Sequence, residues 1–235
     1  MLVLNILVMM VCAVWGQDGV WNGEVAETLE PTSENENVYH ISTAAELAGL
    51  AKLVNDGNDF AGKTVILQNN IVLNENVLDK EGDLQGDGSE LEDWTPIGDY
   101  YDKSFKGTFD GNGYKVSGVY IEYSGDSGYL GLFGSLGEGG VIKNVGVEES
   151  YVRGTGIQAN VGGVCGKNSG GTISNSYNAG SVEGTRHDVA VGGVCGYSSR
   201  GAIFNSHNTG SVKGTGNETV NGPSVGGVCG YSYYG

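Results

Sequence analysis

Few side chains in this sequence have the types and spacing that catalysis requires. The histidines are His40, His187 and His207, and no His-Glu-x-x-His motif is present, so the ligand set of a zinc peptidase is lacking. Paired carboxylates for glycoside cleavage do not recur at equivalent positions of the repeated segments. We therefore expect a chain that is not an enzyme and has no catalytic residue, cofactor or metal. The alternative, a carbohydrate-active enzyme, would need acidic side chains that converge from residues 74–93 and 102–126.

The acidic insertion at residues 74–93 carries side chains that calcium prefers. Five of them match ligand positions 1, 3, 5, 9 and 12 of an EF-hand loop: Asp79, Glu81, Asp83, Asp87 and Glu90. Position 6 of such a loop is a glycine that makes a sharp turn, whereas here it is Leu84, and no helices flank the segment. We expect a mobile acidic loop, with a weak cation site as the alternative.

Three cysteines lie in three copies of one phrase, Val-Gly-Gly-Val-Cys-Gly. Cys165 and Cys195 are 30 residues apart, and Cys229 follows after another 34. The stretch Gly171–Thr185 also recurs, as Gly201–Thr215, between the second and third copies. Self-similarity of this length and period predicts a stacked-repeat protein, in which each repeat buries its apolar face against its neighbours.

Glycine interrupts each repeat every few residues, which argues against helices because each glycine costs a helix about 1 kcal/mol relative to alanine. Short apolar stretches joined by glycine and asparagine corners favour an all-β fold, a right-handed parallel β-helix (β-solenoid). Equivalent residues of successive turns then stack about 4.8 Å apart, so the cysteines form one inward column and Ile173 and Ile203 another. Asn175 and Asn205 should form a hydrogen-bonded ladder at a corner.

A degenerate copy of the repeat precedes the three others and has Phe133 at the position of the cysteine. The column therefore requires apolar bulk rather than sulfur chemistry. We expect buried free thiols at Cys165, Cys195 and Cys229, with a disulfide or a metal site as the alternatives.

Residues 1–16 carry no charged side chain and include a run of Leu, Val, Ile and Met. This is typical of a secretory signal peptide, although the usual basic residue at the front is missing; a buried first strand is the alternative. We expect a secreted or cell-surface protein with no membrane insertion after removal of the signal. Residues 17–37 hold six acidic and no basic side chains and should form a solvated acidic linker.

The whole chain is acidic, with 28 acidic and 12 basic side chains and a net charge of −16. Without a basic patch, such a chain is a poor partner for nucleic acid or an anionic membrane. We therefore expect no nucleic-acid partner.

Residues 38–63 should form a strand and a capping helix before the β-helix, which we place at 64–235. Thr43 and Glu46 have the spacing of a capping box and predict a helix from Ala44 to about Asn55. An amphipathic helix at this place would cover the open core and the strand edge of the first coil.

Phe105–Ile121 contains Gly-Thr-Phe-Asp-Gly-Asn-Gly, in which two adjacent turn dipeptides lie between alternating apolar residues. With the strand and helix before it and the Val-Gly-Gly-Val-Cys-Gly phrases after it, this stretch resembles the GLUG-motif repeat family of bacterial secreted and cell-surface proteins. The resemblance covers about residues 38–235. It implies an adhesin-like protein, or the non-catalytic part of a zinc peptidase that cleaves immunoglobulin A. The repeats fall at about residues 128–155, 161–185, 191–215 and, incompletely, 225–235.

Variation among the repeats is concentrated where one repeat joins the next, at Gly156–Asn160, Arg186–Ala190 and Gly216–Ser224. These segments should project from one edge of the coil as a row of loops, the usual binding face of a repeat protein. We expect a non-catalytic recognition surface for a host or matrix protein or glycan; the alternative is that the loops are solvated turns of a stalk. The candidate binding residues are Arg186, His187, Asp188, Asn217 and Glu218.

The last repeat, Gly226–Gly235, lacks the Thr-Ile-Ser-Asn half that the earlier repeats have. We therefore expect the chain to be incomplete. An uncapped coil exposes strand edges and core, so we also expect possible self-association through this end.

Overall fold

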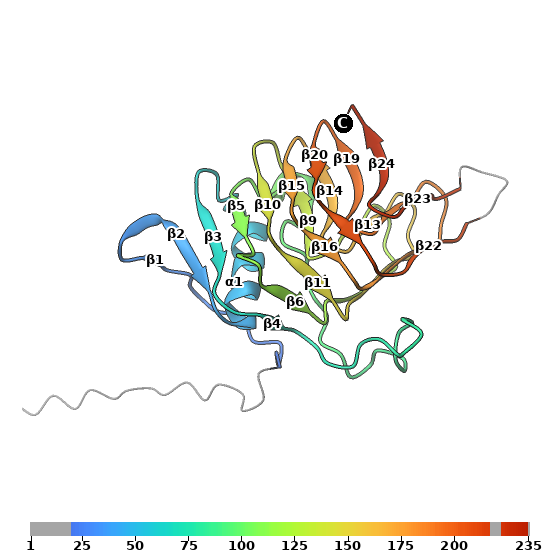
Figure 1. Cartoon of the computed structure of the whole chain (residues 1–235), viewed down its shortest axis with the longest axis horizontal. Helices are drawn as coiled ribbons and strands as arrows, with labels where there is room; N and C mark the ends of the chain where they lie inside the picture. Colours follow the sequence, from blue (N-terminus) through green and yellow to red (C-terminus); the bar gives the residue numbers. More distant parts are fainter. Residues whose placement is uncertain (1–19, 217–221, 235) are drawn as a thin grey trace, which may run out of the picture.

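The chain winds into a parallel β-helix in which the strands of successive turns pair side by side (Figure 1). The structure is a computed structural model of the 235-residue chain, and it describes residues 20–216 and 222–234. The predicted fold class, an all-β right-handed parallel β-helix with an N-terminal helical cap, is confirmed. The expected signal peptide at residues 1–16 lies outside the described residues.

A β-hairpin precedes the helix. β1 (Pro31–Thr32) pairs antiparallel with β2 (Asn35–Ile41). Upstream of the hairpin, Trp21 meets Trp94 edge-on, with 5.9 Å between the ring centroids. Residues 20–37, the described part of the segment that we expected to be a solvated linker, are thus attached to the fold by strand pairing and by this aromatic contact.

Helix α1 (Ala44–Asn55) has the predicted bounds because its start is encoded locally. The Thr43 hydroxyl accepts a hydrogen bond from the Glu46 amide at 3.3 Å, and the Glu46 carboxylate accepts one from the Thr43 amide at 3.1 Å, which completes the capping box. The helix connects β2 to the next parallel strand and joins the core at the N-terminal end of the coil. Its buried apolar side chains are Leu47, Ala48, Leu50, Ala51 and Val54.

β3 (Thr64–Leu67) and β4 (Ile71–Val72) open the coil. The chain then runs irregularly, apart from the short 3₁₀ helix η1 (Tyr101–Lys103). Within this stretch Ile97 and Phe105 form isolated parallel bridges to the following turn. The irregular segment therefore completes the first, incomplete turn of the coil.

Four further turns follow, and each contains five short strands that pair in parallel with their equivalents in the neighbouring turns. The first of these turns consists of β5 (Thr108–Asp110), β6 (Lys115–Ser117), β7 (Tyr120–Tyr123), β8 (Tyr129–Leu130) and β9 (Phe133–Leu136). The second consists of β10 (Val141–Lys143), β11 (Gly146–Glu148), β12 (Tyr151–Gly154), β13 (Asn160–Gly162) and β14 (Cys165–Ser169).

The third and fourth turns repeat this order and correspond to the most similar parts of the sequence. The third consists of β15 (Thr172–Ser174), β16 (Tyr177–Asn178), β17 (Ser181–Gly184), β18 (Ala190–Gly192) and β19 (Cys195–Ser199). The fourth consists of β20 (Ala202–Phe204), β21 (His207–Asn208), β22 (Val212–Gly214), β23 (Ser224–Gly226) and β24 (Cys229–Tyr233).

The cysteines stack in the predicted inward column. Cys165 pairs with Cys195 and Cys195 with Cys229, and Phe133 precedes them in the same column. Cys165 and Cys195 are fully buried, whereas Cys229 in the fourth turn is half-buried. Because a phenylalanine ring occupies the equivalent place in the turn before, the column is filled by apolar volume.

The isoleucine column follows the prediction, whereas the side-chain hydrogen bond at the asparagine corner joins Asn175 to Asn144 and not to Asn205. Ile173 pairs with Ile203 inside the coil. At the next corner Asn144, Asn175 and Asn205 adopt left-handed backbone angles, with φ of 56°, 49° and 50°, a conformation that asparagine tolerates better than most residues. The Asn175 amide donates to the Asn144 side-chain oxygen at 3.3 Å, so the ladder links successive turns.

Residues 74–93 form a strap across one face of the coil, not the mobile loop that their charge led us to expect. Val77 is buried with Tyr120 and Tyr151, which stack with 6.4 Å between the ring centroids. Leu84, at the position where an EF-hand would have glycine, packs against the same cluster. Apolar contacts therefore dock the strap, which its acidic composition concealed.

The strap's carboxylates stabilise local turns and one distant contact. Asp79 accepts hydrogen bonds at 3.0 Å from the amides of Glu81 and Asp83. The Asp83 carboxylate also contacts the ammonium of Lys213 in the fourth turn. Within residues 20–216 and 222–234, no group of three or more His, Cys, Asp or Glu side chains is arranged to hold a metal ion.

Candidate functional site

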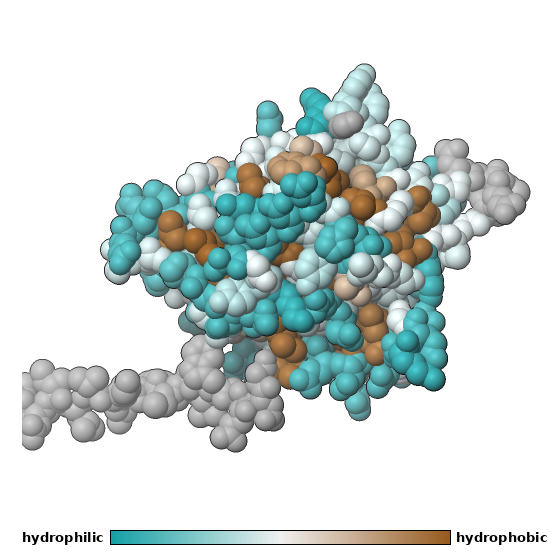
Figure 2. All heavy atoms as spheres, viewed as in Figure 1, coloured by the Kyte–Doolittle hydropathy of each residue, from teal (hydrophilic) through white to brown (hydrophobic). Residues whose placement is uncertain are grey.

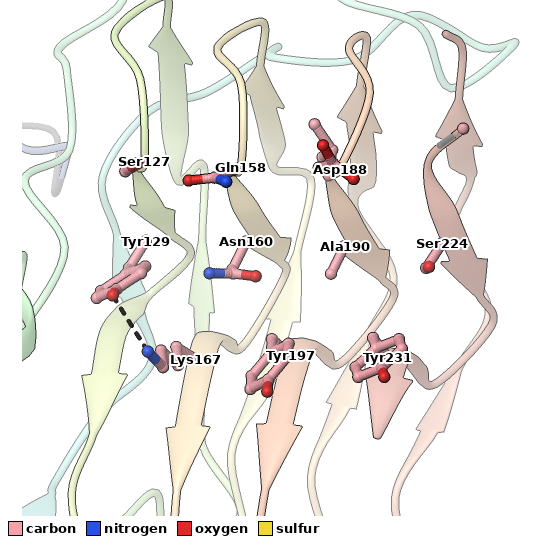
Figure 3. A pocket seen from close by; sticks show the side chains of 12 residues that line it. Ser127, Tyr129, Gln158, Asn160, Lys167, Asp188, Ala190, Tyr197, Ser224 and Tyr231 are labelled. Atoms are coloured by element: carbon pink, nitrogen blue, oxygen red, sulfur yellow. Dashed lines mark hydrogen bonds between the residues drawn. The ribbon is translucent and has the colours of Figure 1, made fainter. Parts of the chain in front are cut away.

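A groove crosses the four full turns on the outside of the coil (Figure 3) and has a volume of about 830 Å³. Three columns of side chains line it, and each column takes equivalent residues from successive turns. The loop column is Ser127, Gln158 and Asp188; the floor column is Tyr129, Asn160, Ala190 and Ser224; the wall column is Lys167, Tyr197 and Tyr231.

The loop column is built by tight turns that repeat from one coil to the next. Ser127, Gln158 and Asp188 each have a left-handed backbone, with φ of 61°, 59° and 57°. The Ser127 amide donates to the Ile157 carbonyl at 2.8 Å, so the first turn rests on the second. The turns therefore lie in a row along one edge of the groove, as we predicted for the variable segments between the repeats (Figure 3).

The floor column belongs to one parallel sheet, formed by β8, β13, β18 and β23. Asn160 pairs with Tyr129 on one side and with Ala190 on the other, and Ala190 pairs with Ser224. The next residue of β13, Val161, is fully buried. Alternation along the strand thus directs Asn160 outward into the groove.

The wall column combines a lysine with tyrosine rings. The Lys167 ammonium donates to the Tyr129 hydroxyl at 3.2 Å (dashed in Figure 3) and lies 4.8 Å from the Tyr129 ring centroid and 5.7 Å from that of Tyr197. Both distances suit a cation–π contact. Tyr197 and Tyr231 stack with 5.4 Å between centroids and an interplanar angle of 12°. The stacked faces cover each other, so this pair offers mainly ring edges and hydroxyls to the groove.

The groove is nearly neutral in a strongly acidic protein. Lys167 and Asp188 are the charged side chains among its lining residues, so their formal charges cancel. The other polar side chains of the lining are amides and hydroxyls, which both donate and accept hydrogen bonds.

The structure brings one of the predicted binding residues into this groove. Asp188 lines it, whereas Arg186 is exposed on the same loop, outside the lining. The His187 Nδ1 lies 3.4 Å from the Asp188 carboxylate on the same loop, and no hydrogen bond joins the two side chains. Asn217 and Glu218 lie outside the described residues.

The sequence did not single out the wall column. Strict alternation from the buried Cys165 would place Lys167 inside the coil. Gly166, however, is packed so closely that an added Cβ would come within 2.5 Å of the Leu130 amide nitrogen. The alternation of β14 is broken there, because Lys167 is only half-buried whereas Asn168 is buried. The repeated phrase Cys-Gly-Tyr, which contains Tyr197 and Tyr231, was the available signal.

Among the described residues, the carboxyl groups with a shifted pKa are all shifted downward, which does not suit a general acid. Burial alone would raise the pKa of Glu148, but the Lys115 ammonium at 2.5 Å and the Tyr177 hydroxyl outweigh it and lower that pKa. A glycosidase acid needs the opposite displacement. The carboxyl groups with a lowered pKa are Asp59, Asp87, Asp110 and Glu148.

Fold and groove together define a glycine-rich β-solenoid repeat protein with an open groove along its coil. Residues 158–183, which run from β13 of the second full turn to β17 of the third, match the family model of the GLUG motif. The resemblance noted from the repeated phrases is thereby confirmed.

Two curated relatives are similar over part of the chain. A protein of Evansella cellulosilytica, named as a candidate Gly-rich membrane protein, is 32% identical over 164 residues, which cover 70% of this chain. Halomucin of Haloquadratum walsbyi is 36% identical over 87 residues, or 37% of this chain. The chain spans only 17% and 1% of the lengths of these two relatives.

A solved structure shares the fold. The crystal structure of a candidate immunoglobulin A1 protease from Bacteroides ovatus superposes with a TM-score of 0.54 over 86% of this chain and 63% of the other. At 18% identity, this likeness concerns the fold alone. As for membranes, the helices in the described residues are too short or too polar to span one.

Proposed function

We propose that this chain is a non-catalytic recognition module of a secreted or cell-surface protein, and that it binds its partner through the groove. The observation that carries the proposal is the alignment of the loop, floor and wall columns across successive turns. A buried stack needs only its inward columns, whereas these outward columns place hydrogen-bonding groups at regular intervals on one face.

The proposed location is supported by the relatives and by the N-terminal sequence. Both relatives carry names of surface type, a Gly-rich membrane protein and a halomucin. The apolar, uncharged residues 1–16 have the character of a secretory signal. Within this location we propose an adhesin-like role for the chain.

The charge distribution supports a partner other than nucleic acid. The chain's net charge of −16 repels polyanions, and the lining of the groove contributes a single lysine, which the Tyr129 hydroxyl already contacts. A neutral partner, or one that is recognised through hydrogen bonds, fits this surface better than a polyanion does.

Replacing the variable loops tests the proposal. The segments 156–158, 186–188 and 216–222 are each changed to a short Gly-Ser turn, and adhesion of protein-coated beads to cultured epithelial cells and matrix proteins is measured. We expect the fold to persist, because residues 156–158 and 186–188 lie outside the paired strands, and we expect adhesion to be lost. Glu149→Ser, an exposed corner residue away from the groove, is the control and should keep full adhesion.

Two results would contradict the proposal. Unchanged adhesion after loop replacement would leave the chain as a stalk. Release of soluble sugars from polysaccharides incubated with the protein would indicate a carbohydrate-active enzyme.

A further inference from the structure

We infer that the groove binds an unbranched, uncharged polysaccharide that lies along the axis of the coil. This inference rests on the proposed function and specifies the partner. It follows from the direction of the groove, from the chemistry of its lining and from its charge.

The direction of the groove excludes recognition of a peptide by β-strand addition. β13 pairs with β8 and β18, and β14 pairs with β9 and β19, so the backbone hydrogen bonds of the groove surface are used within the coil. A peptide therefore has no free strand edge to extend. The ligand must cross the strands and be recognised by side chains.

The lining offers hydrogen-bonding groups in a regular array. Gln158 and Asn160 lie in the same turn, and each amide supplies both a donor and an acceptor. Adjacent sugar hydroxyls also donate and accept, so they match this pair. The next turn contributes the Asp188 carboxylate and the Tyr197 hydroxyl.

The spacing of the coil favours a polymer over a small molecule. Equivalent side chains recur once per turn, at about 4.8 Å, and the groove crosses four turns (Figure 3). Its volume of about 830 Å³ lies in the upper part of the usual range of ligand pockets, about 300–1,000 Å³. An extended chain of sugar units can contact several turns at once and gains affinity with each.

Charge decides between neutral and acidic glycans. The formal charges of Lys167 and Asp188 cancel within the groove, and the Lys167 ammonium is already engaged by the Tyr129 hydroxyl and ring. The coil around the groove is also close to neutral, because residues 101–235 hold 10 acidic and 9 basic side chains. A uronic-acid or sulfated polymer would find no excess of positive charge to offset the desolvation of its anionic groups, whereas an uncharged polymer carries no such cost.

The test measures binding of neutral linear oligosaccharides, first on an array and then by calorimetry with the hexasaccharide and disaccharide of the best series. Hexagalacturonate is the acidic probe. The groove variant combines Gln158→Gly with Asn160→Ala, and glycine accepts the left-handed backbone at Gln158 without strain. Glu149→Gly, at an exposed left-handed position on another corner, is the matched control.

We expect the neutral hexasaccharide to bind at least about tenfold more tightly than the disaccharide, and the groove variant to lose about tenfold through the missing hydrogen bonds. The Glu149→Gly control should bind like the unaltered protein. Tighter binding of hexagalacturonate, or equal binding by the groove variant, would overturn the inference. If no neutral glycan binds but loop replacement still abolishes adhesion, the inference is wrong and the proposed function stands.

Discussion

At the scale of single residues, contacts between neighbouring turns shift the pKa of side chains on the surface of the coil. Tyr177 donates to the Glu148 carboxylate, and burial, followed by this hydrogen bond, raises the Tyr177 pKa from 10.0 to about 12. The neutral phenol therefore contributes stability that is complete below pH 10 and is lost as the pH rises towards about 12.

Glu148→Gln should bring the Tyr177 pKa down towards 10, because the negative charge that disfavours the phenolate is removed. The titration can be followed by NMR of the tyrosine rings, with Tyr177→Phe to assign the signal. Glu149→Gln changes the neighbouring exposed carboxylate and should leave the titration as it is. An unaltered Tyr177 titration in Glu148→Gln would show that the carboxylate does not hold the phenol.

The cysteine column predicts an order of thiol reactivity. Cys165 and Cys195 are fully buried, and the hydrogen bond with Cys165, together with burial, raises the pKa of the Cys195 thiol. Cys229 is half-buried, and the hydrogen bond with Cys195, together with burial, raises the pKa of its thiol too. Because thiolates react and buried thiols need local opening, Cys229 should be alkylated first in the native protein. Mass spectrometry after timed alkylation checks this order, and equal labelling of all three thiols would contradict the column.

At the scale of elements, the strap predicts a measurable docking energy. Leu84 packs against the cluster of Val77, Tyr120 and Tyr151, and its loss should weaken docking by about 1 kcal/mol. Leu84→Ser should therefore speed tryptic cleavage at Lys80, whose side chain is exposed on the strap. Glu90→Ser, which changes an exposed carboxylate on the same strap away from the cleavage site, should not. Equal cleavage rates in both variants would mean that the apolar contact does not hold the strap.

Elements encoded by local pattern could be predicted from the sequence, whereas elements held by tertiary contacts could not. The capping box of Thr43 and Glu46 identified α1, and the repeated cysteines gave the register of the coil. The docking of the strap could not be predicted, because its composition is acidic. The apolar contacts of Leu84 depend on tyrosines of β7 and β12, which are distant in the sequence. The wall column was missed because the alternation of buried and exposed residues along β14 is broken at Gly166.

At the scale of the whole molecule, the coil is stabilised by the contacts of each turn with its neighbours. Figure 2 shows polar side chains over much of one face, with brown apolar patches between them. Burial decreases in the fourth turn: Ile173 is fully buried, whereas its partner Ile203 is only half-buried, and Phe204 is 50% exposed. Amide hydrogen exchange should therefore be fastest in β20 to β24 and slowest in β13 to β19. Uniform protection across the turns would contradict this gradient.

The exposed strands of the fourth turn, β20 to β24, should let two copies of the chain associate. In the described part of the chain, β20 to β24 pair with the third turn on one side, and their other side carries exposed Phe204 and Val225. Unpaired strand edges with apolar side chains favour pairing between molecules, and a lysine on the edge opposes it. Phe204→Lys should therefore shift the protein towards monomer in sedimentation velocity at rising concentration. Lys143→Arg, which keeps the charge of a half-buried position in the second full turn, serves as the control. A protein that stays monomeric at all concentrations before any substitution would refute association through this edge.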